Sequence, residues 1–163
     1  MMNRFLRLAL ATVLAATACC LHAADFQGTV THVTDGDSIW VRPAGGGAPR
    51  ELRVQGIDAP EICQAWGREA RDALAAQVLH RQVRVVSRGR DTYRRTLARV
   101  SYGGQDVGAW MVSHGHAWSY QFRRDSGPYS QQQAQAMQAR LGLWRANSPM
   151  APRDFRKRHG GCK

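Results

Sequence analysis

The sequence predicts an α+β protein: a small five-stranded β-barrel with three packed helices, preceded by a signal peptide. Five short runs of alternating apolar and polar residues have the period of half-buried strands, and three other stretches carry apolar residues at the helical period. Turn-forming Gly, Asp and Pro residues separate these runs. About 140 residues follow the leader, which is enough for one domain with a single core.

The expected strands lie at residues 28–34, 39–42, 51–55, 83–87 and 97–102. Asp35 and Gly36 form an Asp-Gly turn between the first two strands, and Val33 and Ile39 flank it, which is a strong hairpin signal. The basic segment 88–95 separates the last two strands. This pattern fits a small barrel but does not by itself say which kind of barrel.

Three helices are expected outside the barrel. The first spans residues 66–80, and a short second helix ends near His114. Ser130 with Gln133 three residues later is a capping-box signature, which predicts the start of the third helix. Gly142 is its expected C-terminal stop. The predicted apolar face of this third helix consists of Ala134, Met137 and Leu141.

Residues 1–23 have the pattern of a secretory signal peptide. Two arginines precede an apolar run at residues 8–20, which is too short to be a transmembrane helix. A lipoprotein anchor at Cys19 is the less favoured alternative, because the Leu usual three residues before such a cysteine is absent. We expect a periplasmic or secreted protein, with a domain at residues 24–146 and a basic tail at residues 147–163.

The mature chain is strongly basic. The full sequence has a formal net charge of +11, and removal of the leader takes away only Arg4 and Arg7, which leaves +9. Basic charge supplies the sequence-independent part of nucleic-acid affinity. By itself it would also suit an anionic membrane surface or an acidic polysaccharide.

Cys63 and Cys162 remain after the leader is removed. An even number of cysteines in an exported protein favours a disulfide, with two free thiols as the alternative. The bridge would hold the tail, which has little apolar content, beside the turn that leads into the first helix. The tail residues that it would bring near a bound strand are Arg153, Arg156 and Lys157.

The stretch at residues 53–61 reads Arg-Val-Gln-Gly-Ile-Asp-Ala-Pro-Glu and carries the chemistry. It follows an alternating run and ends beside a proline, so we expect a strand that leads into a fixed turn. If this strand pairs with the upstream hairpin, Asp37, Asp58 and Glu61 converge, with Arg53 beside them. Three neighbouring carboxylates repel one another unless a cation lies among them. The pattern therefore indicates metal-assisted phosphoryl transfer.

The order and spacing of these motifs resemble the staphylococcal nuclease (thermonuclease) family. Asp-Gly-Asp-Ser at 35–38, Arg53, Asp-Ala-Pro-Glu at 58–61 and Tyr-Arg-Arg at 93–95 occur in register, and the similarity runs from about residue 28 to residue 144. Any one motif alone could be an ordinary turn, whereas all of them together are specific. The resemblance implies an OB-fold and an exported, Ca²⁺-dependent, sugar-non-specific nuclease that hydrolyses phosphodiester bonds in DNA and RNA.

The resemblance implies a calcium site made by Asp37, Asp58 and the backbone carbonyl of Ala59. The family usually has Thr where this chain has Ala59; a carbonyl ligand tolerates the change, although any contribution of a Thr hydroxyl is lost. Calcium is the expected ion because the ligands are hard oxygens in an exported protein, whereas magnesium demands stricter octahedral geometry.

The resemblance also implies the catalytic residues. Glu61 would orient or deprotonate the attacking water, and Arg53 and Arg95 would bracket the phosphate, because a planar guanidinium can bind two oxygens at once. The family usually has Gly where this chain has Arg94, and Arg adopts a positive φ less readily than Gly. Arg95 matches the catalytic position better by its spacing to the following strand; Arg94 is the alternative or an extra phosphate contact.

Tyr93 and Tyr120 resemble the aromatic residues that surround the base and the terminal phosphate in the family. Stacking on a base tolerates any sequence, as suits a non-specific nuclease; core packing is the alternative for Tyr120. We expect a monomer without a stable membrane partner. Two rival functions are a catalytically weak nucleic-acid-binding module of the same fold and a basic envelope protein that binds anionic glycans or lipids. The presence of the complete set of acidic and arginine residues argues against both.

Overall fold

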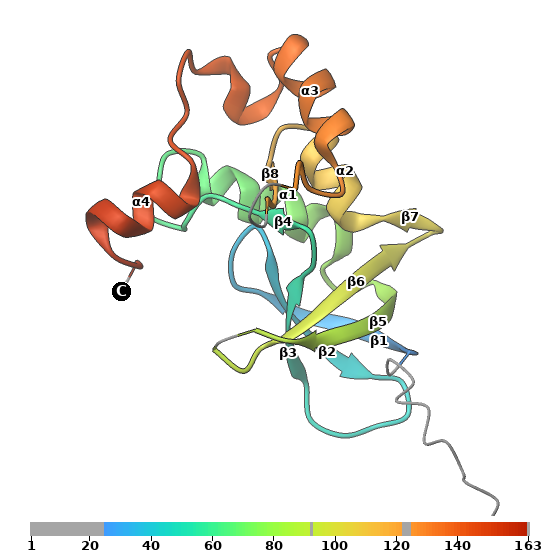
Figure 1. The fold of residues 1–163 in the computed structure, drawn as a ribbon. Helices are drawn as coiled ribbons and strands as arrows, with labels where there is room; N and C mark the ends of the chain where they lie inside the picture. The colour runs from blue at the N-terminus through green and yellow to red at the C-terminus, as the bar shows by residue number, and fades with distance from the viewer. Residues whose placement is uncertain (1–24, 92, 122–124, 163) are drawn as a thin grey trace, which may run out of the picture.

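The computed structural model describes residues 25–91, 93–121 and 125–162, and a closed barrel is its central feature (Figure 1). Five strands of the described chain form the barrel: β1 (Asp25–Val33), β2 (Ser38–Pro43), β3 (Arg50–Val54), β5 (Gln82–Arg90) and β6 (Thr96–Tyr102). Antiparallel pairs run in the order β3-β2-β1-β5-β6, and a parallel pairing of β3 with β6 closes the sheet. This arrangement is consistent with the expected OB-fold.

Short elements extend the barrel on one side. β4 (Ile57–Asp58) pairs with β8 (Trp118–Ser119), and β7 (Gln105–Asp106) continues the sheet beyond β6. The helical elements of the described residues are α1 (Gly67–Val78), α2 (Val107–Ser113), α3 (Ser130–Gln138), the 3₁₀ turn η1 (Gly142–Arg145) and α4 (Pro152–His159). Figure 1 shows that the helices gather at one end of the barrel, while the β2–β3 connection extends from the opposite end.

The barrel interior is filled by aliphatic side chains that alternate along each strand. Fully buried examples are Val30, Ile39, Val41, Leu52, Val85 and Val100. α1 covers this core through Ala70, Leu74 and Val78, which are spaced four residues apart and therefore share one face of the helix. The predicted period of the strands and of the first helix is confirmed by this burial pattern.

The third helix begins at Ser130, where the sequence predicts its start, but the predicted cap and apolar face are wrong. Tyr129 is the N-cap, no side chain caps the helix, and the Gln133 amide oxygen instead accepts a hydrogen bond from the backbone N–H of Ser119 at 2.8 Å. The apolar face also differs: Ala136 is buried, whereas the side chains of Met137 and Leu141 are 48% and 38% exposed. The reason is that α3 packs through Ala136 against Leu143 and Trp144 of η1, so a small residue forms the contact.

The stop of α3 also lies earlier than predicted. The helix ends at Gln138, and Arg140 takes the left-handed backbone conformation with φ 52°, so the chain has left the helix before Gly142. Gly142 instead begins η1. Gly142 is also left-handed, with φ 54°, but the helix has already ended before it, so it does not act as the helix stop.

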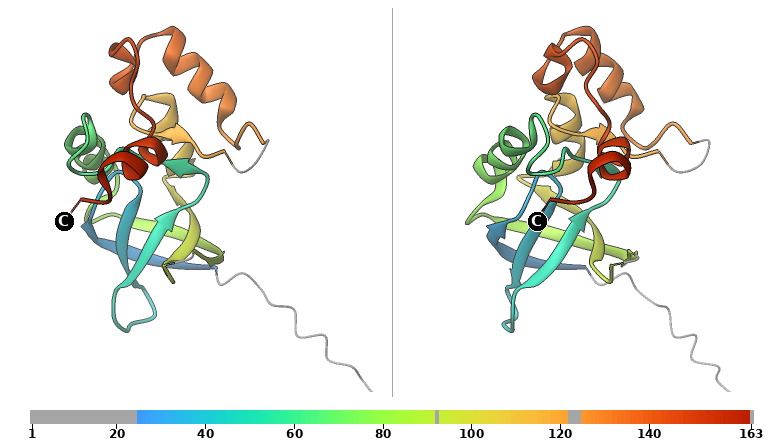
Figure 2. Two further views of the ribbon diagram at one scale, coloured as in Figure 1. Left: turned by 60° about the vertical axis from the view of Figure 1, so that its left-hand side comes forward. Right: turned by 90° about the vertical axis from the view of Figure 1, so that its left-hand side faces the viewer.

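Within the C-terminal tail, residues 152–159 form the helix α4. The prediction of three helices is therefore corrected to four in the described chain. Pro152 starts α4 at the position where a missing N–H costs least. In both views of Figure 2, α4 lies across the end of the barrel beside the segment that follows β4.

The predicted signal peptide at residues 1–23 lies outside the described residues. Within the described ranges, no helix has both the length and the apolar character that crossing a membrane requires.

Candidate active site

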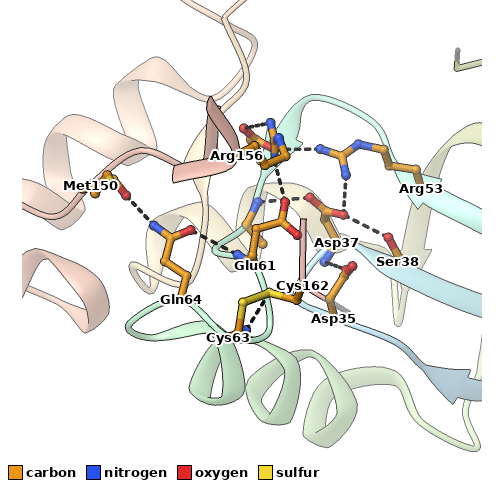
Figure 3. Close-up of polar contacts among 12 residues, drawn as sticks. Asp35, Asp37, Ser38, Arg53, Glu61, Cys63, Gln64, Met150, Arg156 and Cys162 are labelled. Atoms are coloured by element: carbon orange, nitrogen blue, oxygen red, sulfur yellow. Dashed lines mark hydrogen bonds and ion pairs between the residues drawn. A yellow bond between two sulfur atoms is a disulfide. The ribbon is translucent and has the colours of Figure 1, made fainter. Parts of the chain in front are cut away.

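Two buried aspartates and one arginine form the centre of the site. Asp37 precedes β2, Asp58 ends β4, and Arg53 on β3 lies between them. Arg53 donates from Nη1 to Asp37 Oδ1 at 2.6 Å and from Nη2 to Asp58 Oδ1 at 2.8 Å. Strand register explains the placement, since Arg53 is paired with Ser38 of β2. The structure thus brings together the three residues that the sequence places near one another, and Figure 3 shows Arg53 beside Asp37.

Close packing holds the Asp37 turn in place. The Asp37 N–H donates to Asp35 Oδ1 at 2.9 Å, and Asp37 Oδ2 accepts a hydrogen bond from the backbone N–H of Ala59 at 3.0 Å. A Cβ atom on Gly36 would lie 2.7 Å from Ala59 Cβ and 2.8 Å from Ala70 Cβ. Gly36 is therefore required for the turn to lie against β4 and α1.

Glu61 is placed by the start of α1. Its backbone N–H donates to the Gln64 side chain at 3.2 Å, and a Cβ atom on Gly67 would come within 1.9 Å of the Glu61 carbonyl oxygen. Only a glycine allows the first turn of α1 to approach the Glu61 backbone this closely. The Glu61 carboxylate then faces the same space as Asp37 and Arg53 (Figure 3).

Arg95 reaches the site from the start of β6, the strand that pairs in parallel with β3. It precedes β6, and its Nη1 atom lies 3.3 Å from Ser38 Oγ, next to Asp37. Asp91 fixes it from both ends, because the Arg95 Nε donates to Asp91 Oδ2 at 2.8 Å and the Arg95 N–H donates to Asp91 Oδ1 at 2.9 Å. The neighbouring Arg94 has φ 67°, so this chain keeps a left-handed residue there without using Gly, and the Arg94 side chain is exposed.

A cavity of about 910 Å³ connects these groups. Its lining includes Asp37, Arg53, Glu61 and Arg95 as well as both predicted tyrosines. The residue Tyr93 is 79% exposed and Tyr120 is 44% exposed. Core packing of Tyr120, the alternative considered for this residue, is therefore wrong. Arg94 is not part of the lining, which favours Arg95 as the arginine that faces a substrate.

Arg156 of α4 also enters the site. It donates from Nη1 to Glu61 Oε1 at 2.8 Å and from Nη2 to Asp58 Oδ2 at 3.1 Å. The disulfide between Cys63 and Cys162, which the structure contains as expected, fixes the end of the tail beside the turn after Glu61. The sequence placed Arg156 near a bound strand but did not predict that it pairs with the acidic residues.

The charges perturb one another strongly. Burial raises the pKa of Asp37 to about 6, although the positive charge of Arg53 opposes this shift. Burial alone would lower the pKa of Arg53, but the charges of Asp37 and Asp58 outweigh it, so this pKa is raised. Burial likewise would raise the pKa of Asp91, but the hydrogen bonds from Arg95 outweigh it and hold this pKa below its ordinary value. Arg53 is therefore a permanent cation.

The donor set of the site suits a hard cation. No group of three or more His, Cys, Asp or Glu side chains in the described ranges is arranged around a common point as a metal site. Asp37 and Asp58 do converge, since one guanidinium contacts both, and the Ala59 backbone adjoins them. Two carboxylates and a carbonyl are the oxygen ligands that calcium takes, with water completing the shell. The residues thus fit the implied ion, provided that the Asp58 oxygens are released from their arginines.

Three residues of the site were missed or only partly anticipated by sequence reasoning. Asp91, four residues before Arg95, could have been found from that spacing and from its place in the β5–β6 turn. Gln64 binds the Met150 carbonyl oxygen at 2.6 Å and ties the tail to the site, with no signal in either segment. The pairing of Arg156 with Asp58 spans 98 residues and leaves no local pattern.

Comparison with known proteins agrees with this geometry. Residues 51–146 match the family described as "Staphylococcal nuclease homologue". An "uncharacterized endonuclease" of Haemophilus influenzae is 35% identical over 128 residues, which cover 78% of this chain and 71% of the relative. A "Micrococcal nuclease" of Shigella flexneri is 34% identical over 145 residues, which cover 82% of each chain. A "Probable staphylococcal-like nuclease CAN4" of Oryza sativa subsp. japonica is 32% identical over 107 residues, 66% of this chain but only 22% of the relative.

Proposed function

Because the chain belongs to the staphylococcal nuclease homologue family and is thus an endonuclease, a hydrolase of phosphodiester bonds, we propose that it is exported, depends on Ca²⁺ and cleaves DNA and RNA without selecting the sugar. One observation carries the proposal. Asp37, Glu61, Arg53 and Arg95 line one cavity, and Arg53 joins Asp58 to this group through a hydrogen bond. A binding module or a glycan-binding envelope protein would need no such cluster.

The acidic residues hold and activate the reactants. Asp37, Asp58 and the Ala59 carbonyl would hold calcium, which when bound supplies positive charge to the non-bridging phosphate oxygens. Glu61 would accept a proton from the attacking water while the water oxygen forms a bond to phosphorus. The bond from phosphorus to the leaving oxygen then breaks, and that oxygen is protonated from solvent.

The arginines hold the phosphate and the aspartates. Arg95 is fixed by Asp91 through Nε and the backbone, which leaves its Nη groups to contact a phosphate. Arg53 lies between Asp37 and Asp58, so its first role is to position them; a guanidinium has five N–H donors, so some remain for a phosphate oxygen.

The surroundings of the site suit a long, sequence-independent polyanion. Tyr93 and Tyr120 line the cavity and offer exposed rings on which bases of any sequence stack. The net charge of +9 after removal of residues 1–23 supplies general attraction to nucleic acid. We propose that residues 1–23 direct export to the periplasm or the medium and that the mature enzyme is a monomer.

A cleavage assay tests the proposal. Single- and double-stranded DNA and RNA are incubated with the protein in calcium, in magnesium and in chelator. We expect cleavage of all four substrates in calcium and none in chelator, with activity restored when calcium is returned. Glu61→Gln is the inactive control, expected to lose on the order of 10²–10⁴ in turnover while retaining binding; Glu69→Gln, an exposed position on α1, is the matched control. Full cleavage in chelator would contradict the metal assignment.

A further inference from the structure

Arg156, on the C-terminal helix α4, places a positively charged side chain beside Asp58 and Glu61. Arg156 Nη1 lies 2.8 Å from Glu61 Oε1 and 3.3 Å from Asp58 Oδ1, and Nη2 lies 3.1 Å from Asp58 Oδ2. Arg53 Nη2 lies 2.8 Å from Asp58 Oδ1. Both oxygens of Asp58 therefore accept hydrogen bonds from guanidinium groups, and Figure 3 shows Arg53 and Arg156 approaching from different elements.

A divalent cation held by Asp58 would meet Arg156 at the same oxygens. Each carboxylate oxygen has two lone pairs. Asp58 Oδ1 accepts from both Arg53 and Arg156, whereas Oδ2 accepts from Arg156 alone, so hydrogen-bonding capacity by itself would still admit a metal ion at Oδ2. The charges of Arg156 and the metal ion have the same sign, however, and would lie within a few ångströms in a partly buried pocket, where repulsion is stronger than in water. Arg156 and the cation are therefore competitors for one carboxylate.

The tail that carries Arg156 is fastened on both sides of α4. Before the helix, the Met150 carbonyl oxygen accepts a hydrogen bond from the Gln64 side chain at 2.6 Å. After it, Cys162 is joined to Cys63, two residues beyond Glu61. A group tethered this closely has a high effective concentration at its target, so it binds much more often than its few contacts alone would allow.

We propose that Arg156 is an intramolecular counter-cation that competes with the divalent cation for Asp58 and Glu61, so that the disulfide-tethered tail sets the cation concentration at which the enzyme works. At a low concentration of the divalent cation, Arg156 neutralises Asp58 and Glu61. At a high concentration, the cation displaces Arg156, and the guanidinium is free to turn towards the substrate strand. The inference rests on the proposed function, because the competing cation is the one assigned to that reaction.

Calcium titration by isothermal calorimetry on the full mature chain tests the competition without relying on activity. Arg156→Ala should bind calcium about tenfold more tightly than the wild-type protein, because a positive charge in contact with the ligand is removed. Arg158→Ala removes the same charge from an exposed position of α4 and should leave the affinity within about twofold. Far-UV circular dichroism establishes that both variants are folded. Arg156→Lys keeps the charge but not the planar guanidinium, so its calcium affinity should lie between those of the Arg156→Ala and Arg158→Ala variants.

The tether has its own test in a double-mutant cycle. Replacing both Cys63 and Cys162 by Ser should tighten calcium binding about threefold or more in the Arg156 background, since the local concentration of the guanidinium falls. The same pair of changes should have no effect in the Arg156→Ala background. An effect of equal size in both backgrounds would show that the disulfide acts by another route.

The outcomes separate this inference from the proposed function. Equal calcium affinity of wild type and Arg156→Ala, with calcium-dependent cleavage intact in the wild type, overturns the competition alone. Weaker calcium binding by Arg156→Ala also overturns it, because Arg156 would then support the site. If neither protein binds calcium, both the competition and the calcium part of the proposed function are wrong.

Discussion

Arg53 and Arg156 both donate hydrogen bonds to Asp58, yet they reach it from different parts of the molecule. Arg53 belongs to the barrel: its strand is paired on both sides, with Ser38 opposite it on β2 and Leu97 on β6, and its side chain is 16% exposed. Arg156 belongs to a terminal helix that no strand pairing holds, and its side chain is 36% exposed. The site thus has a part fixed by the barrel and a part appended to it.

Charged hydrogen bonds to carboxylates hold both arginines, but Arg156 can be displaced more easily than Arg53. Burial would lower the pKa of Arg156, but its hydrogen bonds to Asp58 and Glu61 more than offset this, so the pKa is raised, as it is for Arg53. Arg53 is the guanidinium that contacts both buried aspartates, so its loss would remove a charge partner from each of them, whereas solvent can replace the more exposed Arg156. The barrel therefore provides a constant charge balance, and the tail provides an exchangeable one.

The largest expected effect is the difference in protein stability between variants of the two arginines. Arg53→Ala leaves Asp37 and Asp58 buried without their shared partner and should lower the free energy of unfolding by about 3–5 kcal/mol. Arg156→Ala breaks two ion pairs of a partly exposed guanidinium, with Asp58 and with Glu61, and should cost about 1 kcal/mol or less. Urea denaturation of both variants measures the difference. Similar losses would mean that the barrel and the tail hold Asp58 equally, and the comparison would fail.

The next effect concerns the chemistry of the barrel part. Arg95→Ala should reduce turnover by about 10²–10³, as expected for loss of a donor to developing charge, because Arg95 lines the cavity and is fixed by Asp91. Arg94→Ala, its exposed neighbour, should change turnover by only a few-fold. Single-turnover cleavage in calcium gives both values. The reverse ranking would place the catalytic arginine one residue earlier in the loop.

A smaller effect tests how α1 positions Glu61, the acidic residue that Arg156 contacts. Gly67→Ala would place a Cβ atom 1.9 Å from the Glu61 carbonyl oxygen, and the forced shift of α1 should cost about 1–3 kcal/mol. The substitution should also displace the Glu61 backbone more than Asp37 and Arg53. We therefore expect a slower cleavage rate. Thermal melting together with the cleavage rate follows both effects. Gly45→Ala, at a position with open space around it, is the control and should melt with the wild type.

The smallest expected effect is a gain. Arg94 has φ 67°, which costs an L residue about 1–2 kcal/mol, so Arg94→Gly should raise the free energy of unfolding by about 0.5–1 kcal/mol after the entropy that glycine adds to the unfolded chain. Urea denaturation measures the change. A loss of stability would show that contacts of the Arg94 side chain, rather than the loop backbone, hold this turn.

Much of the barrel part of the site could be predicted from the sequence. Strand burial at period two follows from alternation, and Asp58 and Glu61 lie three residues apart around a proline, so their proximity is local. The details of α3 could not be predicted in the same way. Its surface is polar on most sides, so neither the capping signature nor the weak apolar pattern decides which face packs; the contact of Ala136 with η1 does.

By itself, then, the sequence determined the strands, the first helix and the chemical identity of the site, because these depend on periodicity and on residues close together in the chain. Only the tertiary structure decided that β3 pairs in parallel with β6, which brings Arg95 to Ser38, and that α4 returns to place Arg156 on Asp58. Arg95 and Ser38 are 57 positions apart in the sequence, and Arg156 and Asp58 are 98 positions apart. Such pairings arise from barrel closure and from the Cys63–Cys162 tether, and neither leaves a local pattern in the sequence.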